Sequence, residues 1–75
     1  MKELIEYIAK SIVDSPDEVV VTEEADESGT VFKLQVADED KGRVIGKQGR
    51  VAEAMRALLR VKAAKQSTRA TLEIL

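Results

Sequence analysis

The chain has 75 residues, a net charge of −2 and a hydrophobic fraction of 44%, and it contains neither cysteine nor histidine. This length predicts one domain with a limited core, and the hydrophobic fraction is that of a folded protein. Without cysteine or histidine, disulfides, thiolate zinc sites and imidazole catalysis are excluded. Acidic residues within 1–6 and the lack of an apolar run of roughly 20 residues argue against a secretion signal or a membrane span, so we expect a cytoplasmic protein.

The N-terminal half predicts a helix followed by a β-hairpin. Apolar residues recur at helical spacing over 3–13, and Pro16 ends this pattern. Residues 18–24 are rich in β-branched side chains and residues 30–37 alternate between apolar and polar, so both are predicted strands. The intervening residues 25–29 are polar and end in glycine, which is typical of a turn. We therefore expect an antiparallel hairpin with one buried face.

The C-terminal half predicts two helices and a last strand. The acidic residues 38–40 are expected to cap a short helix that runs to Ile45. Residues 50–65 have high helix propensity throughout, and residues 68–75 alternate as a strand does. The order is α-β-β-α-α-β, which predicts an α+β fold with three helices on one face of a three-stranded sheet.

Residues 46–49, with the sequence Gly-Lys-Gln-Gly, interrupt the two C-terminal helices. Two glycines three apart allow a sharp turn and a close approach of a ligand to the backbone. The loop leads into the N-terminus of the 50–65 helix, where free N–H groups and the positive end of the dipole favour phosphate. With basic residues at 43, 47 and 50, this pattern indicates binding of a phosphate backbone without catalysis.

Charge is distributed unevenly along the chain. Residues 1–37 hold three basic and nine acidic residues, whereas residues 38–75 hold nine basic and five acidic residues. A local basic surface matters more for polyanion binding than the total charge does. Two alternatives stay open: the basic residues form an ordinary solvated helix face, or Gly-x-x-Gly is only a tight turn between packed helices.

The sequence from Gly42 to Arg50 (Gly-Arg-Val-Ile-Gly-Lys-Gln-Gly-Arg) resembles the signature of the KH domain, whose Gly-x-x-Gly loop clamps about four backbone nucleotides. The element order resembles the type II KH arrangement, and the size and motif are similar to the KhpA family of small stand-alone bacterial KH proteins. The resemblance implies a single KH domain over 1–75 that binds single-stranded RNA between the two helices joined by the loop and the adjacent strand. The RNA-binding residues that it implies are Arg43, Val44, Ile45, Gly46, Lys47, Gln48, Gly49 and Arg50.

The resemblance also implies partners and a cellular role. KhpA-like proteins pair with a larger KH-containing protein, KhpB, also called Jag or EloR. The chain would then act as a small RNA chaperone or post-transcriptional regulator in cell elongation, cell shape and wall homeostasis. It implies no cofactor and no metal.

The 50–65 helix carries more apolar surface than one core contact requires. We expect one stripe to pack on the sheet, namely Val51, Ala54, Met55, Leu58 and Lys62. A second stripe, extended by Ala52, Leu59 and Ala63, predicts a dimer interface at Ala57, Val61 and Ala64, either in a homodimer or with a KhpB-like protein. Alternatively, the alanines are only good helix formers on a solvated face.

Other functions fit the residues less well. The Gly-x-x-x-Gly-Lys sequence at 42–47 resembles a phosphate-binding loop of enzymes, but the spacing is one residue short and Gln48 follows the lysine, so no enzyme is expected. The only aromatic residues, Tyr7 and Phe32, are expected to be structural, which leaves little base stacking. A protein-interaction module whose loop does not contact RNA stays open as the alternative.

Overall fold

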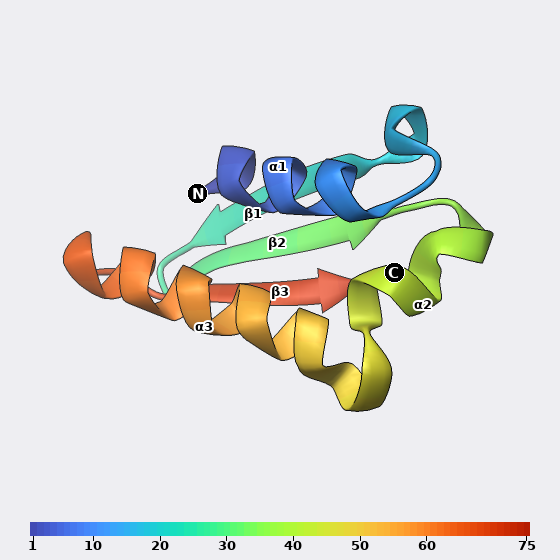
Figure 1. The fold of residues 1–75 in the computed structure, drawn as a ribbon. Coiled ribbons are helices and arrows are strands. Elements are labelled where there is room, and N and C mark those ends of the chain that lie inside the picture. Colours follow the sequence, from blue (N-terminus) through green and yellow to red (C-terminus); the bar gives the residue numbers. More distant parts are fainter.

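Three strands form one mixed sheet in a computed structural model that describes residues 1–75 (Figure 1). β1 (Val20–Asp26) and β2 (Gly29–Gln35) pair antiparallel, and β3 (Ala70–Ile74) pairs parallel with β2. β2 is therefore the central strand, and β1 and β3 are the two edges. The presence of the predicted antiparallel hairpin and of a last strand is confirmed, with bounds that differ by a few residues.

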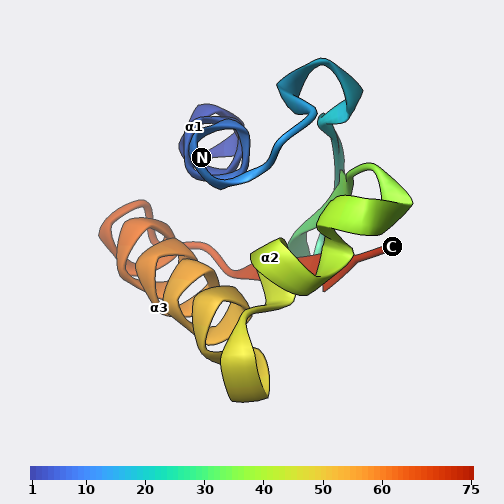
Figure 2. The same cartoon turned by 45° about the vertical axis from the view of Figure 1, so that its right-hand side comes forward.

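The helices lie together on one side of this sheet. α1 (Lys2–Ile12) and α3 (Arg50–Lys65) run across the same face, and α2 (Lys41–Ile45) closes one end of the layer between them (Figures 1 and 2). The α+β architecture and the element order predicted from the sequence are confirmed. None of the helices combines the length and the apolar content needed to cross a bilayer.

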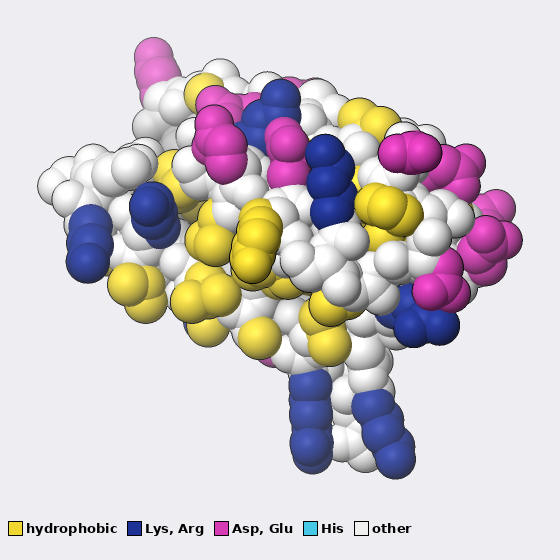
Figure 3. Space-filling model, turned by 45° about the horizontal axis from the view of Figure 1, so that its top comes forward, with side chains coloured by type: hydrophobic (Ala, Val, Ile, Leu, Met, Phe, Trp, Pro, Cys, Tyr) yellow, Lys and Arg dark blue, Asp and Glu magenta, His cyan; other side chains and the backbone are white.

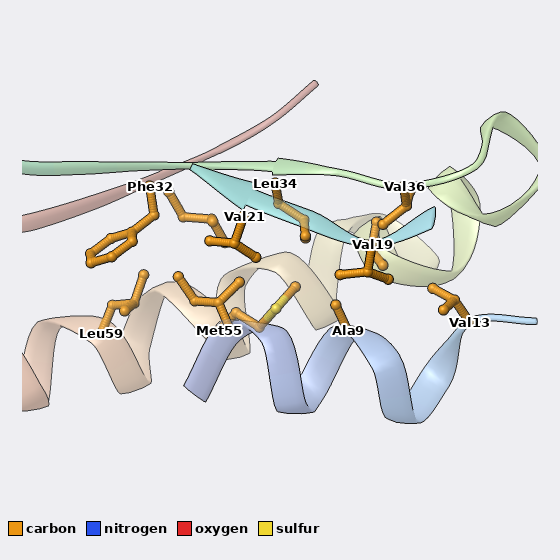
Figure 4. Close-up of a cluster of buried hydrophobic side chains, with 12 residues drawn as sticks. Ala9, Val13, Val19, Val21, Phe32, Leu34, Val36, Met55 and Leu59 are labelled. Carbon is orange, nitrogen blue, oxygen red and sulfur yellow. The ribbon is translucent and has the colours of Figure 1, made fainter. Parts of the chain in front are cut away.

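The core fills the space between the sheet and the helices (Figure 4). Because side chains alternate along a strand, Phe32 and Leu34 of β2 point toward the helices while Gln35 is exposed. Phe32 pairs in register with Leu72 of β3, and Leu34 pairs with Val21 of β1, so the three strands present one apolar surface. Each such buried side chain stabilises the fold by about 1.5–3 kcal/mol. Phe32 is structural, as expected.

The predicted start of the first strand is wrong by two residues. A 3₁₀ turn, η1 (Pro16–Glu18), precedes β1, and the N–H of Val19 donates to the carbonyl of Pro16 at 3.2 Å. Proline fixes the φ angle that such a turn requires at its first position. The strand therefore begins only at Val20.

The hairpin turn and the last strand also differ from the prediction. β1 continues to Asp26, because the carboxylate of Asp26 accepts the N–H of Ser28 at 2.7 Å and tightens the turn to two residues. β3 begins at Ala70 instead of residue 68, because the N–H of Thr68 still donates to the carbonyl of Ala63 in α3 at 2.9 Å.

The predicted core stripe of α3 is right for Met55 and for the partly buried Val51 but wrong for Ala54, Leu58 and Lys62. The side chains that face the core are Ala52, Met55, Leu59 and Ala63, whereas Ala54 is exposed and Leu58 is 48% exposed. Both stripes recur at helical spacing, so apolar periodicity did not distinguish them. The small side chains of Ala52 and Ala63 let the helix lie close to the sheet, and the larger Leu58 remains outside.

Candidate nucleic-acid interface

Gly46 ends α2 and begins the loop. Its N–H donates to the carbonyl of Gly42 at 2.8 Å, and its φ of 77° and ψ of 172° lie in a region that glycine alone adopts readily. A Cβ at this position would lie 2.8 Å from the backbone nitrogen of Val51 and closer still to the Val51 side chain. Glycine at 46 is therefore required both by the backbone conformation and by the packing of α3 against the loop.

The second half of the loop turns through the left-handed region. Gln48 has φ 59° and ψ 27°, and Gly49 has φ 74° and ψ 13°. The N–H of Gly49 donates to the carbonyl of Gly46 at 3.2 Å, which closes the 3₁₀ turn η3 (Lys47–Gly49). Two successive left-handed residues turn the chain sharply, so that α3 begins directly at Arg50. The Lys-Gln tip is exposed as a result.

The N-terminus of α3 has no side-chain cap. Gly49 occupies the capping position and no side chain accepts a hydrogen bond from the first turn. The N–H of Arg50 donates to the carbonyl of Lys47, but the first turn has no side-chain acceptor, so its remaining N–H groups and the positive end of the 16-residue helix are available to an anion.

The basic side chains at the loop are free of carboxylates. Lys47 and Arg50 take part in none of the ion pairs of the protein, and the nearest polar contact of Arg50 is the side-chain oxygen of Gln48, at 3.4 Å. Figure 3 shows two Lys or Arg side chains extending from the lower edge of the molecule, away from the Asp and Glu side chains at its right-hand end. The loop thus presents positive charge in an otherwise acidic protein of net charge −2.

Val44 and Ile45 differ in exposure. Val44 is fully buried and belongs to the hydrophobic core, so it supports α2 from beneath. Ile45 is 41% exposed immediately before the loop and offers an apolar surface beside the basic tip.

Arg43 lies in different surroundings from Lys47 and Arg50. Its Nη2 atom lies 3.1 Å from Oδ2 of Asp14, and its Nε atom lies 3.8 Å from Oδ1 of Asp40. The structure therefore brings Lys47, Gln48 and Arg50 together at the loop, while the guanidinium of Arg43 lies between two carboxylates at the end of α1.

The expected capping role of residues 38–40 is wrong in its details. These residues form a 3₁₀ turn, η2 (Asp38–Asp40), and no side chain among them caps α2. Instead, the fully buried carboxylate of Asp40 accepts the N–H groups of Asp14 and Ser15, each at 3.1 Å. Those two amides follow the end of α1 and have no other acceptor there. The carboxylate of Asp40 therefore binds these distant amides instead of capping α2.

Surface depressions lie at the opposite end of the molecule. Two of them surround the tip of the β1–β2 hairpin and the turn after α3, and they include Asp26, Ser28 and Arg69. A third lies between the C-terminal part of α3 and β3 and includes Ala63 and Thr71. The loop itself protrudes. A protruding loop suits contact with an extended polymer backbone, whereas small-molecule sites are concave.

An exposed apolar strip runs along the outer face of α3. It consists of Ala54, Ala57, Leu58, Val61 and Ala64. Val61 in this strip is 58% exposed. Tyr7, on α1, is 73% exposed, so the expectation that it is structural is wrong. The three residues predicted for a dimer interface are thus all on the surface and all on one helix face.

The sequence profile of the family described as "KhpA/KhpB, KH domain" matches residues 2–74. The chain belongs to this family. Several relatives carry the name "RNA-binding protein KhpA". That of Clostridium acetobutylicum is 51% identical over 75 residues and covers the whole of both chains. That of Treponema pallidum is 50% identical over 74 residues, which are 99% of this chain and 92% of the relative.

The family extends across distant bacteria. The relative of the same name from Listeria monocytogenes is 47% identical over 75 residues, which are all of this chain and 99% of the relative. No solved structure matches the chain at a significant level. Membership in a KH family agrees with the α-β-β-α-α-β order and with the Gly-x-x-Gly loop between α2 and α3.

Sequence reasoning missed the contacts of Asp14 and Asp40. The signal available was the run of acids at 38–40, which was interpreted as a helix cap because acids commonly occur there. A buried carboxylate that joins segments about 26 positions apart leaves no local pattern, so only the fold reveals it.

Proposed function

We propose that the protein binds single-stranded RNA at the loop of residues 46–49, with the phosphate backbone held by Lys47, Gln48, Arg50 and the free amides at the start of α3. The single observation that carries this proposal is the uncapped N-terminus of α3, preceded by two glycines with positive φ and flanked by Lys47 and Arg50, which form no ion pairs. The names of the relatives, which are RNA-binding proteins, support RNA as the polyanion.

From the loop, the single-stranded RNA would continue along the surface between α2, α3 and the free edge of β3. Exposed Ile45 gives the bases an apolar contact, and β3 pairs only with β2, so its outer edge has backbone groups without strand partners. Arg56 reaches this edge, where its Nη2 atom donates to the carbonyl of Leu72 at 3.5 Å. A contact of about four nucleotides is weak and falls with salt, because most of its affinity comes from phosphate.

The proposal includes a dimer through the outer face of α3. Val61 and Leu58 are large apolar side chains that are 58% and 48% exposed, and Ala57 and Ala64 allow close approach of a second helix. A homodimer or a heterodimer with a KhpB-like protein would join two weak RNA sites and raise avidity. We further propose a role in the cytoplasm as an RNA chaperone or post-transcriptional regulator in cell elongation and wall homeostasis, which extends beyond the RNA binding named in the relatives.

Replacing both Lys47 and Gln48 with Asp tests the RNA proposal. Two carboxylates would face phosphate, so the affinity for a fluorescein-labelled single-stranded RNA should fall more than about tenfold in anisotropy titrations. Asp tolerates the left-handed backbone at 48, so the circular dichroism spectrum and the melting temperature should stay close to wild type.

The chain offers a matched control for this variant. Lys65 and Gln66 are the same two residue types in the same order, exposed at the far end of α3. Changing both to Asp alters the net charge equally but should leave RNA affinity near wild type. Equal losses in the two variants would indicate a general charge effect, and no loss in either would favour a protein-interaction module without RNA contact.

Val61→Asp tests the dimer. A carboxylate at the centre of an apolar interface should convert the protein to monomer in light scattering, because burial of an unpaired charge is costly. Val20→Asp is the control, since Val20 is 51% exposed on β1, away from α3. A dimer that persists in Val61→Asp, or that is lost equally in Val20→Asp, would contradict the α3 interface.

A further inference from the structure

We infer that Asp40 and Arg43 are positioning residues that fix the RNA-binding loop to the end of α1, and that Arg43 is not itself a phosphate contact. The inference rests on the proposed function, and it assigns to Arg43 a role other than the one that resemblance to KH domains implies. The observation behind it is the convergence of two backbone amides and one guanidinium on the carboxylate of Asp40.

The short helix α2 depends on such contacts for its orientation. Its five residues form little more than one turn, and isolated helices of this length are unstable in water. Two anchors hold it: the buried side chain of Val44 on the apolar side, and Asp40 on the side of α1. Because Gly46 follows Ile45 directly, a change in the direction of α2 moves the loop.

Asp40 is suited to this role because it is the only buried polar or charged residue of the protein. Its two oxygens accept from Asp14 and Ser15 separately, so the carboxylate holds both the position and the rotation of η2 against the end of α1. Nε of Arg43, one turn further along, faces Oδ1 of Asp40 at 3.8 Å and ties α2 to the same point.

The electrostatics around Arg43 oppose a phosphate contact. The cluster of Asp14, Asp40 and Arg43 carries one positive and two negative charges, so an approaching phosphate meets a net negative site. The side chain of Asp14 is 71% exposed, so its charge faces solvent beside Arg43. Figure 3 shows that acidic side chains gather at this end of the molecule, over the turns that join α1 to β1 and β2 to α2. Lys47, three positions beyond Val44, has no such neighbours.

The salt dependence of RNA binding separates the two roles. Each phosphate contact that a cation makes to single-stranded nucleic acid contributes about 0.7 to the slope of log affinity against log salt concentration. With a fluorescein-labelled single-stranded RNA of mixed sequence, Lys47→Gln should reduce the slope by this amount. Arg43→Gln should leave the slope at the wild-type value while weakening affinity several-fold at every salt concentration.

Asp40→Asn tests the positioning role directly. The amide presents a donor to one of the two backbone N–H groups, so this variant should weaken RNA binding of the folded protein several-fold without changing the slope. The amide signals of Gly46 and Gly49 should shift in the ¹H–¹⁵N spectrum. If Asp40 only stabilised the fold, Asp40→Asn would lower the melting temperature but leave these signals and the affinity of the folded protein unchanged. That result would overturn the inference.

If Asp40→Asn does not fold, Asp14→Asn serves as a second test. The side chain of Asp14 is 71% exposed, so this variant should fold. If Arg43 were a phosphate contact restrained by Asp14, its release would raise both affinity and slope, and that result would overturn the inference. An unchanged slope supports it. A reduced slope in both Lys47→Gln and Arg43→Gln would overturn the inference alone, whereas an unchanged slope in Lys47→Gln would overturn the loop contact itself and the inference with it.

Discussion

The two segments on either side of Ile45 share one motif but have opposite surroundings. Before Ile45, residues 40–44 are tied to the rest of the protein by a buried carboxylate, an ion pair and the core side chain of Val44. In residues 46–50, the side chains of Lys47 and Arg50 have no carboxylate partner, and the backbone turns through positive φ angles. Residues 40–44 are thus anchored to the protein and hold the exposed loop that follows them. Residues a few positions apart in the motif therefore have different roles.

Among the three glycines of residues 42–49, Gly46→Ala should produce the largest effect, because the change falls at the boundary between these segments. The backbone region is costly for alanine and the new Cβ would clash with Val51, so we expect a loss of about 2–4 kcal/mol in the free energy of unfolding. Chemical denaturation measures it. Stability equal to that of the wild type would contradict the described loop geometry.

Gly49→Ala should have a smaller effect. The left-handed φ of 74° costs a residue with a Cβ roughly 1–2 kcal/mol, but nothing lies within 4 Å of the position that the Cβ would occupy. Most of the loss should therefore be conformational. In the same denaturation experiment, a loss as large as that of Gly46→Ala would mean that the loop is packed more tightly than its exposure indicates.

Gly42→Ala should have the smallest effect and the opposite sign. Gly42 lies in α2 with an ordinary helical backbone and open space around the Cβ position, so alanine should stabilise the protein by about 0.5–1 kcal/mol. Together the three variants distinguish the anchored segment, which accepts a side chain, from the loop, which does not. A destabilised Gly42→Ala protein would break that distinction.

Much of this fold follows from local patterns. The bounds of α3, the hairpin, the inward face of β3 and the burial of Phe32 are all encoded by periodicity and propensity, which short segments carry by themselves. The loop is also visible in the sequence, because Gly-x-x-Gly ahead of a strong helix former is a local feature.

The parts that escaped prediction depend on contacts between distant segments. The rotation of α3 was ambiguous because two apolar stripes overlap, and only packing against the core beneath the sheet selects Leu59 over Leu58. The surroundings of Arg43 depend on Asp14, which belongs to the other half of the chain. A motif therefore predicts which residue types are present at a site, while the tertiary neighbours decide which of them are free to bind.

Mapping of RNA crosslinks by mass spectrometry tests the central claim most directly. After ultraviolet irradiation of the full-length protein bound to single-stranded RNA, the crosslinked residues should lie within 45–50 and on the adjoining first turn of α3. Crosslinks confined to the outer face of the sheet or to the hairpin tip near Ser28, with none at the loop, would contradict the assignment of the loop as the RNA-binding site.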